Sequence, residues 1–421
     1  MRHLGALAFL LFWMLAASGI YLYVRFDTSA AGAYDSIGEM EWWFGGVLRS
    51  VHRYAADAFV VVTLAHLLRE LWLGRFRSWR AFTWISGIPL VWLLYASGLI
   101  GYWLVWDTRS QFSFLATLEW MGVAARVGEA PDRLFSLFVF LHIGLPLALL
   151  AGMWVHVQRL GSPKTLPPSG LTFMWVGLLL ALAALRPAAS EPRWDPSRAP
   201  QGVAVDWFYQ FIHPLMYATS PTLLWGAVLG ATALLLLMPY VSKKPRLAVA
   251  QVDPANCNAC GRCVTDCPYN AILLAEKAVV LPGRCAACGI CAGACPSSTP
   301  FRSIEHLVSG IELPDQTVQG LRSKVQAVLA SGSRELVFSC QTNANPEAIA
   351  LRCLAMLPPS VVEYALRRGA RQVRAVGCES ECAYRLGMTL CDERFAARRE
   401  PHLRATVRAE RKDNEYSFVL R

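Results

Sequence analysis

The sequence predicts a multi-domain protein, with an all-α bundle of six transmembrane helices followed by a cysteine-rich region that ends in a small α/β domain. Hydrophobic residues make up 55% of its 421 residues, a proportion typical of membrane proteins. None of its 13 cysteines precedes Cys257, so the chain has two halves of different character that join near residues 243–245. The cysteines are spaced like metal ligands rather than like a disulfide framework, which indicates a reducing compartment, the cytoplasm.

Six apolar stretches are candidates to cross a bilayer. They are Leu4–Val24, Val47–Leu73, Phe82–Trp106, Leu134–Val157, Leu171–Leu185 and Leu223–Val241. The first also resembles a signal peptide, with small residues at Ala16–Gly19, although its glycine spacing, described below, favours retention.

Positive charge predicts the orientation of the bundle. The connections after the second, fourth and sixth spans are basic, with Arg75, Arg77, Arg80, Arg159, Lys164, Lys243, Lys244 and Arg246. The opposite loops are longer and contain many acids. The basic side of a membrane protein is normally cytoplasmic. We therefore expect a multi-pass protein of the cytoplasmic (inner) membrane, with its cysteine-rich half on the cytoplasmic side.

Two of the spans carry histidines at equal spacing. His52 and His66 are fourteen residues apart, as are His142 and His156. At ~1.5 Å rise per residue, each pair spans roughly 21 Å on nearly one helix face. A lone histidine in a membrane helix is usually a structural residue whose hydrogen bonds are satisfied within the helix bundle. Burying an ionisable group in a membrane is costly, however, so such a group is a functional candidate by default. Four histidines in two matched pairs predict two six-coordinate haems stacked across the bilayer.

Glycines in two further spans repeat the same period. Gly5 and Gly19 are fourteen residues apart in the first span, and Gly87 and Gly101 are fourteen apart in the third. Glycine has no Cβ and gives room to a macrocycle between helices. Small residues also allow close helix contact without a cofactor, but the period shared with the histidines favours haem.

These residues carry a resemblance over about residues 1–241 to the cytochrome b of quinol-oxidising bc complexes. Trp43–Gly74, Leu99–Asp107 (LIGYWLVWD) and Phe140–Pro146 (FLHIGLP) resemble segments of that family. The resemblance implies that His52 and His142 bind an outer b haem and that His66 and His156 bind an inner one. It also implies that Arg49 and Arg69 serve the haem propionates, which need charge-assisted donors, and that the protein is a homodimer.

The stretch Val205–Tyr209 (VDWFY) resembles the Pro-Glu-Trp-Tyr motif at the outer quinol site of that family. The resemblance implies that Asp206, Trp207 and Tyr209 belong to a quinol site in which Asp206 takes a proton. Aspartate is one methylene shorter than the glutamate of the motif, and an interfacial aromatic belt with a solvated Asp206 is the alternative. Gly161 stands where the family has a histidine at the inner site, so an inner quinone site stays open.

A doubled cysteine motif follows the membrane half. Its first copy is Cys257, Cys260, Cys263 and Cys267, and its second copy, 28 residues later, is Cys285, Cys288, Cys291 and Cys295. This is the pattern of bacterial two-cluster ferredoxins, in which the fourth cysteine of each run ligates the other cluster. The pattern predicts one [4Fe–4S] cluster on Cys257, Cys260, Cys263 and Cys295, and a second on Cys285, Cys288, Cys291 and Cys267. A structural zinc site is the alternative.

The C-terminal region predicts alternating strands and helices. Strands at Glu335–Ser339 and Gln372–Gly377 flank a helix at Pro358–Arg368, and each strand leads into a cysteine, as expected for a site at the strand ends of an α/β domain. Cys353–Gly387 resembles the hydrogenase delta-type iron–sulfur subunit. That resemblance implies a [2Fe–2S] centre, for which Cys340, Cys353, Cys378 and Cys382 are the thiolates; zinc or free thiols are the alternative. Cys391 is left over, and the charged tail Arg394–Arg421 reads as a solvated face or a dock for an acidic partner.

Together these patterns predict a membrane cytochrome b domain at 1–245, a ferredoxin domain at 246–303 and a hydrogenase delta-like domain at 304–421. The expected function is a quinone/quinol oxidoreductase subunit that exchanges electrons with a cytoplasmic flavoprotein or a heterodisulfide-reductase or hydrogenase-type partner, with quinol-based electron bifurcation as one mode of exchange. The alternative is a haem-stabilised membrane anchor or scaffold. Despite a formal net charge of +10, no nucleic-acid motif is present.

Overall fold

The computed structural model of the chain describes residues 3–40, 42–122, 131–161, 163–200, 202–241, 247–296, 308–343, 346–378, 382, 384–413 and 415–420. The predicted domain boundaries at 245 and 303, and the basic residues Lys243, Lys244 and Arg246, lie outside the described residues. The chain divides into two compact units. The first is Met1–Val157 with Pro163–Lys243, and the second is Gln158–Ser162 with Lys244–Arg421.

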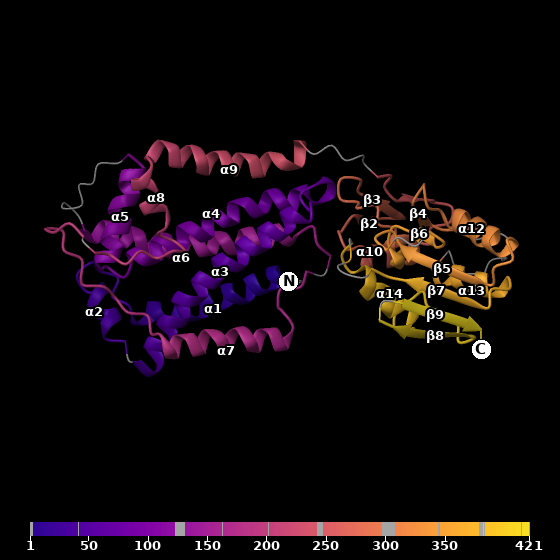
Figure 1. Cartoon of the computed structure of the whole chain (residues 1–421), viewed down its shortest axis with the longest axis horizontal. Helices are drawn as coiled ribbons and strands as arrows, with labels where there is room; N and C mark the ends of the chain where they lie inside the picture. The colour runs from indigo at the N-terminus through magenta and orange to yellow at the C-terminus, as the bar shows by residue number, and fades with distance from the viewer. Residues whose placement is uncertain are drawn as a thin grey trace. The chain divides into compact units, whose positions relative to one another are not determined.

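The first unit is helical (Figure 1). Its elements in chain order are α1 (Leu4–Arg25), α2 (Ala33–Gly38), the π-helical turn η1 (Trp42–Gly46), α3 (Val47–Trp72), the 3-10 turn η2 (Ser78–Arg80), α4 (Ala81–Trp103), α5 (Thr108–Trp120), α6 (Pro131–Val157), α7 (Ser169–Leu185), α8 (Ile212–Ala218) and α9 (Pro221–Val241).

Five helices of the described residues are long and apolar enough to cross a membrane: α1, α3, α4, α6 and α9. Their bounds match the predicted spans to within a few residues, because long apolar runs leave little freedom in where such a helix begins and ends. The remaining predicted span forms α7, which is apolar but has only 17 residues. Five spans are therefore supported by length and composition, and the sixth is not.

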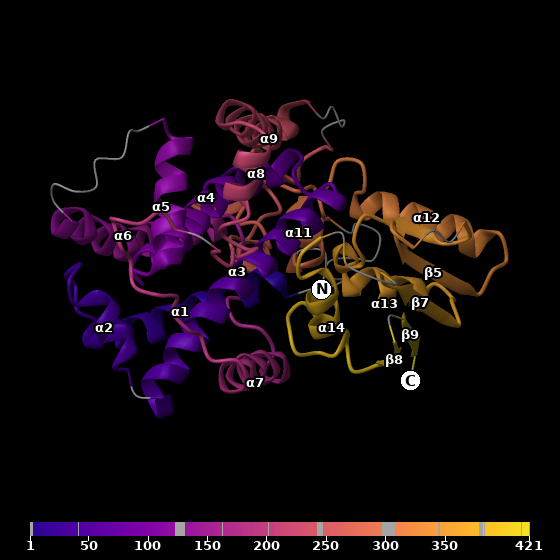
Figure 2. The same ribbon diagram turned by 60° about the vertical axis from the view of Figure 1, so that its left-hand side comes forward.

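The four long helices that carry the predicted histidines and glycines pack in two pairs. Helix α1 packs along α3, and α4 packs along α6, while α7 lies against α3 and α9 lies against α4. Both views show α7 and α9 flanking the bundle (Figures 1 and 2). The pairing joins each histidine helix to one glycine helix.

The loops between the spans contain short helices that hydropathy alone does not predict. Helix α5 begins after Asp107, whose buried side chain accepts a hydrogen bond from the Ser110 amide at 2.8 Å. Asp107 also accepts one from the Glu191 amide at 3.0 Å. An aspartate in this position satisfies free N–H groups of the first helical turn and fastens a distant loop to it.

The second unit combines short helices with three small sheets. Its elements in chain order are β1 (Gln251–Val252), α10 (Arg262–Thr265), β2 (Ile272–Leu274), β3 (Ala278–Val280), α11 (Ile290–Gly293), β4 (Ile311–Glu312), α12 (Val318–Ala330), β5 (Glu335–Cys340), β6 (Ile349–Leu351), the 3-10 turn η4 (Leu354–Met356), α13 (Pro359–Arg367), β7 (Gln372–Val376), α14 (Gly387–Phe395), β8 (Val407–Lys412) and β9 (Glu415–Leu420).

The doubled cysteine motif folds as a structural repeat. Ala259 and Gly261 in the first copy, and Ala287 and Gly289 in the second, all have positive φ. Each glycine is followed at once by a four-residue helix, α10 or α11. Glycine reaches this left-handed conformation without steric cost, so the local sequence sets the same turn around each run of cysteines.

The last part of the second unit is a five-stranded sheet in the order β6-β5-β7-β9-β8. Strands β6, β5 and β7 are parallel, and β9 and β8 are added in antiparallel orientation. The predicted strands at 335–339 and 372–377 and the helix at 358–368 are confirmed as β5, β7 and α13. The prediction for the tail was incomplete, because β8 and β9 form part of this sheet. Tyr416 and Phe418 alternate with exposed or half-exposed residues and pack on Phe395.

A buried ion pair joins the cysteine repeat to the C-terminal helix α14. The Asp266 carboxylate accepts from Arg394 at 2.5 Å and from Arg399 at 2.7 Å, and the Asp266 and Arg394 side chains are both 2% exposed. Arg394 also donates to the carbonyl of Ala355 at 2.6 Å and to that of Ile290 at 3.3 Å. This network ties α14, η4 and α11 into one unit.

Replacing Asp266 with alanine should strongly destabilise the second unit, because it leaves the Arg394 guanidinium buried without its carboxylate. Breaking a buried pair in this way costs about 3–5 kcal/mol in the free energy of unfolding. The measurement is a denaturant titration of the full chain, followed by amide hydrogen exchange in the sheet. Glu415→Ala is the matched control: its pair with Arg374 has side chains 31% and 39% exposed, and removing such a pair costs about 0–1 kcal/mol. Equal losses in the two variants would contradict this account of the network.

Candidate redox and quinol sites

Each predicted histidine of the bundle lies against one of the predicted glycines. A Cβ atom built on Gly101 would lie 2.7 Å from His142 Cε1, and one on Gly87 would lie 3.0 Å from His156 Cε1. On the other helix pair, a Cβ on Gly19 would lie 3.1 Å from His52 Cε1, and one on Gly5 would lie 3.8 Å from His66 Cε1. Glycine is therefore what allows these helices to approach their histidine partners so closely, least stringently at Gly5.

Hydrogen bonds fix three of the four imidazole rings through Nδ1. His142 Nδ1 lies 2.9 Å from the Ser97 carbonyl, to which it donates. His52 Nδ1 lies 3.0 Å from Ser18 Oγ, and His156 Nδ1 lies 3.1 Å from Ser86 Oγ. The Nδ1 of His66 is buried without a hydrogen-bond partner among the described residues. A neutral histidine that donates from Nδ1 presents a lone pair on Nε2, which is the form that binds a metal.

The spacing of His52 and His142 fits two ligands of one iron. Their ring centres are 6.3 Å apart. A metal–imidazole nitrogen bond is about 2 Å long, so two rings on opposite sides of one ion would place their nitrogens about 4 Å apart and their centres roughly 2 Å farther. The residues of this pair therefore fit a haem between them.

The two arginines predicted to serve propionates are engaged with protein groups. Arg49 donates to Ser190 Oγ at 2.7 Å. Arg69 forms an ion pair with Glu70, which also pairs with Arg75 at 3.4 Å and Arg80 at 3.5 Å. The basic connection after α3 thus gathers its charges around one carboxylate, next to the end of the helix that carries His66.

The predicted quinol loop forms a tight turn around Asp206. The Asp206 carboxylate accepts from the amides of Phe208 at 3.0 Å and Tyr209 at 2.7 Å. Tyr209 is buried and donates to the Ala56 carbonyl of α3 at 3.0 Å, whereas Trp207 is 79% exposed. Of the three predicted residues, Asp206 and Tyr209 therefore face the bundle, and Trp207 does not.

Sequence reasoning missed three residues around this loop. Arg53 of α3 pairs with Asp206 at 2.5 Å and also with Asp57, one turn farther along α3. Gly98 of α4 makes room for the loop, because a Cβ there would lie 2.0 Å from the Tyr209 ring. Arg53 and Asp57 were detectable in principle, since charged residues inside an apolar span are functional candidates by default.

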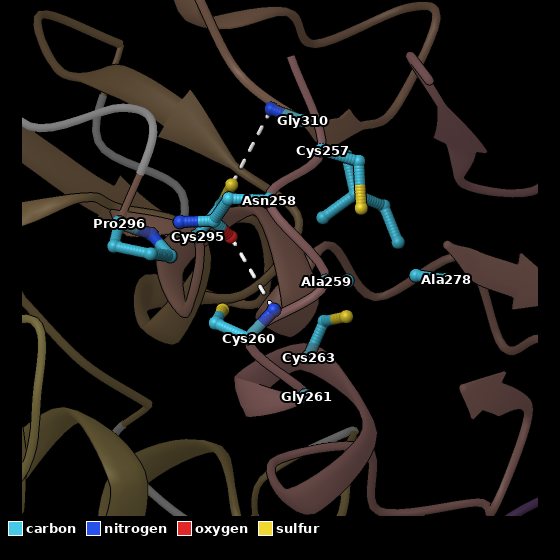
Figure 3. A pocket seen from close by; sticks show the side chains of 11 residues that line it. Cys257, Asn258, Ala259, Cys260, Gly261, Cys263, Ala278, Cys295, Pro296 and Gly310 are labelled. Atoms are coloured by element: carbon cyan, nitrogen blue, oxygen red, sulfur yellow. Dashed lines mark hydrogen bonds between the residues drawn. The ribbon is translucent and has the colours of Figure 1, made fainter. Parts of the chain in front are cut away.

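The eight cysteines of the doubled motif line two separate pockets. One pocket is lined by Cys257, Cys260, Cys263 and Cys295 (Figure 3). The other is lined by Cys267, Cys285, Cys288 and Cys291. In each pocket the fourth cysteine comes from the other copy of the motif. The residues therefore fit the two predicted four-thiolate sets.

Backbone amides and burial shape both pockets. The Gly310 amide donates to Cys295 Sγ at 3.3 Å, and the Ala271 amide donates to Cys267 Sγ at 3.3 Å. Burial raises the pKa of the Cys263 and Cys288 thiols to about 12. Such thiols stay protonated at neutral pH unless a metal centre takes the place of the proton. In the described part of the chain, no three histidine, cysteine or carboxylate side chains are arranged to bind one bare metal ion.

The four remaining predicted cysteines converge where β5 and β7 end. Cys378 Sγ lies 3.3 Å from Cys340 Sγ and 3.6 Å from Cys382 Sγ. A Cβ on Gly387 would lie 2.7 Å from Cys353 Sγ and 3.4 Å from Cys382 Sγ, so the start of α14 closes over this pair. Cys391 is buried one turn farther along α14.

Three family models match successive parts of the chain. Cytochrome b/b6/petB matches residues 1–119, a 4Fe–4S binding domain matches 249–272, and the methyl-viologen-reducing hydrogenase delta subunit matches 329–415. The chain thus joins a cytochrome b region to a 4Fe–4S region and a hydrogenase delta-like region. Cytochrome b implies haem b, and the 4Fe–4S match implies iron–sulfur clusters.

Curated relatives match the membrane half. Cytochrome b of Spizellomyces punctatus is 24% identical over 54% of this chain and 66% of its own length. The cytochrome bc complex cytochrome b subunit of Chlorobaculum thiosulfatiphilum is 26% identical over 49% of this chain and 57% of its own. Cytochrome b6 of Prochlorococcus marinus is 29% identical over 32% and 61%. The chain thus spans less than two thirds of the length of these relatives.

One solved structure, titled hyperthermophilic respiratory Complex III, aligns with a TM-score of 0.48 and 20% identity over 58% of this chain and 76% of that chain.

Replacing Gly101 with valine should lower the haem content of the protein, because the new side chain would displace the His142 ring. We expect the haem bound per chain to fall by about half, since only one histidine pair is affected. Pyridine haemochrome assay on the purified chain measures this. Gly144→Val on α6 is the control, because no atom lies within 4 Å of a Cβ at that position. Full haem content in Gly101→Val would mean that the contact does not position a haem ligand.

Proposed function

We propose that this protein is a membrane electron-transfer subunit that links the quinone/quinol pool, through two b haems, to iron–sulfur clusters on the cytoplasmic side. In this proposal residues 1–245 form the membrane domain, 246–303 the ferredoxin domain and 304–421 the hydrogenase delta-like domain. One observation supports this proposal most: the same chain contains membrane histidines that lie against glycines and two pockets that are each lined by four cysteines.

In this proposal the ligands are assigned as follows. His52 with His142, and His66 with His156, would hold two haem b groups, with Arg49 and Arg69 near their propionates. The two cysteine sets would hold two [4Fe–4S] clusters, and Cys340, Cys353, Cys378 and Cys382 would hold one [2Fe–2S] cluster. When bound, these groups supply one-electron redox chemistry.

The loop of Asp206, Trp207 and Tyr209 is proposed as the outer quinol site, because it packs against α3 within a turn or so of His52. The chain has no flavin or nucleotide fingerprint, so the terminal chemistry belongs to a soluble partner, a flavoprotein or a heterodisulfide-reductase or hydrogenase-type subunit. Outward electron flow to quinone is downhill. Inward flow from quinol to low-potential clusters requires bifurcation or the membrane potential.

The second candidate function is a membrane anchor whose haems only stabilise the bundle. The Nδ1 hydrogen bonds of His52, His142 and His156 would serve an anchor equally well. The two functions differ in whether quinol or a cytoplasmic donor changes the oxidation state of the haems.

Anaerobic addition of a reduced short-chain quinol to the purified full chain in detergent tests the proposal. We expect the haem absorbance to shift to the reduced form. If quinol has no effect but a reduced ferredoxin-type donor reduces the haems, electrons flow outward and the quinone is the acceptor. If neither donor reduces the haems, the anchor function replaces this proposal.

Serine in place of Cys382 should remove iron from the third cysteine site without affecting the other two. We expect a loss of about two iron atoms per chain and of a [2Fe–2S] signal in the electron paramagnetic resonance spectrum of the reduced protein. Cys391→Ser is the matched control, because Cys391 is buried in α14 outside the four-thiolate set. Loss of one zinc with unchanged iron would show a structural zinc site instead.

A further inference from the structure

Helix α3 buries a charged network one turn after His52. Arg53 pairs with Asp57 on the same helix and with Asp206 of the quinol loop. The exposed fractions of the Arg53, Asp57 and Asp206 side chains are 25%, 14% and 7%. One guanidinium balances one carboxylate. The second carboxylate leaves an excess negative charge in apolar surroundings, where the neutral, protonated form is favoured.

The hydrogen bonds distinguish the two carboxylates. Asp206 has three donors: Arg53 at 2.5 Å and the amides of Phe208 and Tyr209. Among the described residues, the one donor that the structure gives Asp57 is Arg53. Each donor occupies a lone pair of the carboxylate that accepts it. Asp57 has fewer donors and is therefore the member of the pair with more lone pairs open to an O–H group of a ligand.

A buried side-chain amide beside this network lacks a hydrogen-bond partner among the described residues. Gln210 is fully buried; its Oε1 accepts from the Asp206 amide at 3.2 Å, but its Nε2 has no hydrogen-bond partner in the described structure. The Tyr102 side chain borders the same network, and the Arg53 guanidinium lies over the Tyr102 ring at 4.8 Å. An unsatisfied buried polar group is costly. A hydroxyl oxygen of a bound ligand could accept from Gln210 Nε2 and remove that cost.

We infer that Asp57 is the group that accepts a proton from hydroquinone at this site, while Asp206 is a positioning residue that holds Arg53 and the loop. This inference rests on the proposed quinol site. In the step, one O–H bond of the hydroquinone breaks, an O–H bond forms on Asp57, and the hydroquinone anion is left with the electron pair. Oxidation of that anion to quinone removes two electrons and the second hydroxyl proton. One-electron oxidants of the class of ferric haem, proposed above, would take the electrons one at a time, and water would take the second proton.

The test is the rate of anaerobic quinol-driven haem reduction against pH in the full chain. General bases typically contribute 10²–10⁴-fold. We therefore expect Asp57→Asn to slow reduction by about 10²-fold or more and to lose the acid limb of the pH profile. Asp57→Glu should restore part of the rate together with that limb. Asp206→Asn should slow reduction but keep a pH-dependent rate, since Asp57 still titrates.

Two controls distinguish failure of this inference from failure of the proposed quinol site. Asp35→Asn removes a carboxylate whose pair with Arg193 is exposed on both sides, and it should leave the rate unchanged. Haem content and reduction by dithionite show whether each variant is folded and loaded. The charged and titratable groups that face Asp57 are Arg53, Asp206, Tyr102 and Tyr209.

Each outcome decides one question. A wild-type rate and pH profile in Asp57→Asn would overturn the inference while leaving the quinol site in place. Loss of the acid limb in Asp206→Asn alone would assign the proton to Asp206 instead. Failure of quinol to reduce wild-type haem, with full dithionite reduction, would overturn this inference, because Asp57 would receive no proton from quinol. The ferredoxin-type donor described above then decides whether quinone is the acceptor or the proposed function fails as well.

Discussion

The first unit depends on how closely two glycine-bearing helices approach two histidine-bearing helices. A Cβ at Gly101 or Gly87 would stand within 3.0 Å of an imidazole carbon, closer than Cβ atoms ordinarily approach. The same approach brings Ser97 and Ser86 to the Nδ1 atoms of these rings. One constraint, the absence of a side chain at a few positions, thus sets helix spacing, ring orientation and the nitrogen left for a metal.

In the second unit, backbone turns rather than helix packing position the candidate ligands. Left-handed residues at Ala259, Gly261, Ala287 and Gly289 repeat one turn twice, and each turn directs cysteines into a pocket. The fourth thiolate of each pocket crosses from the other copy, so neither copy completes its pocket alone. The buried Asp266–Arg394 pair then attaches the delta-like region to this repeat.

The sequence was sufficient for features that follow from periodicity and from spacing. Long apolar runs predicted six membrane spans, of which five form helices long enough to cross a membrane, and strand and helix patterns predicted β5, α13 and β7. The period of fourteen predicted that these glycines and histidines act together, but not that Gly101 lies against His142. The predicted sixth span forms α7, which is apolar but short. The sheet formed by the charged tail was not predicted, because tertiary packing decides it: β9 pairs with β7 and with β8, and buries only alternate side chains. The pairing of Arg53 with Asp206 joins residues 153 positions apart, and no local pattern indicates it.

The central claim is that two histidine pairs hold two haems in one membrane domain. Low-temperature electron paramagnetic resonance of the oxidised full chain, combined with haem quantification, tests it most directly. The account expects two low-spin, bis-histidine haems per chain, with His142→Ala removing one signal and leaving the other. A single haem, or a high-spin signal from five-coordinate iron, would contradict the account.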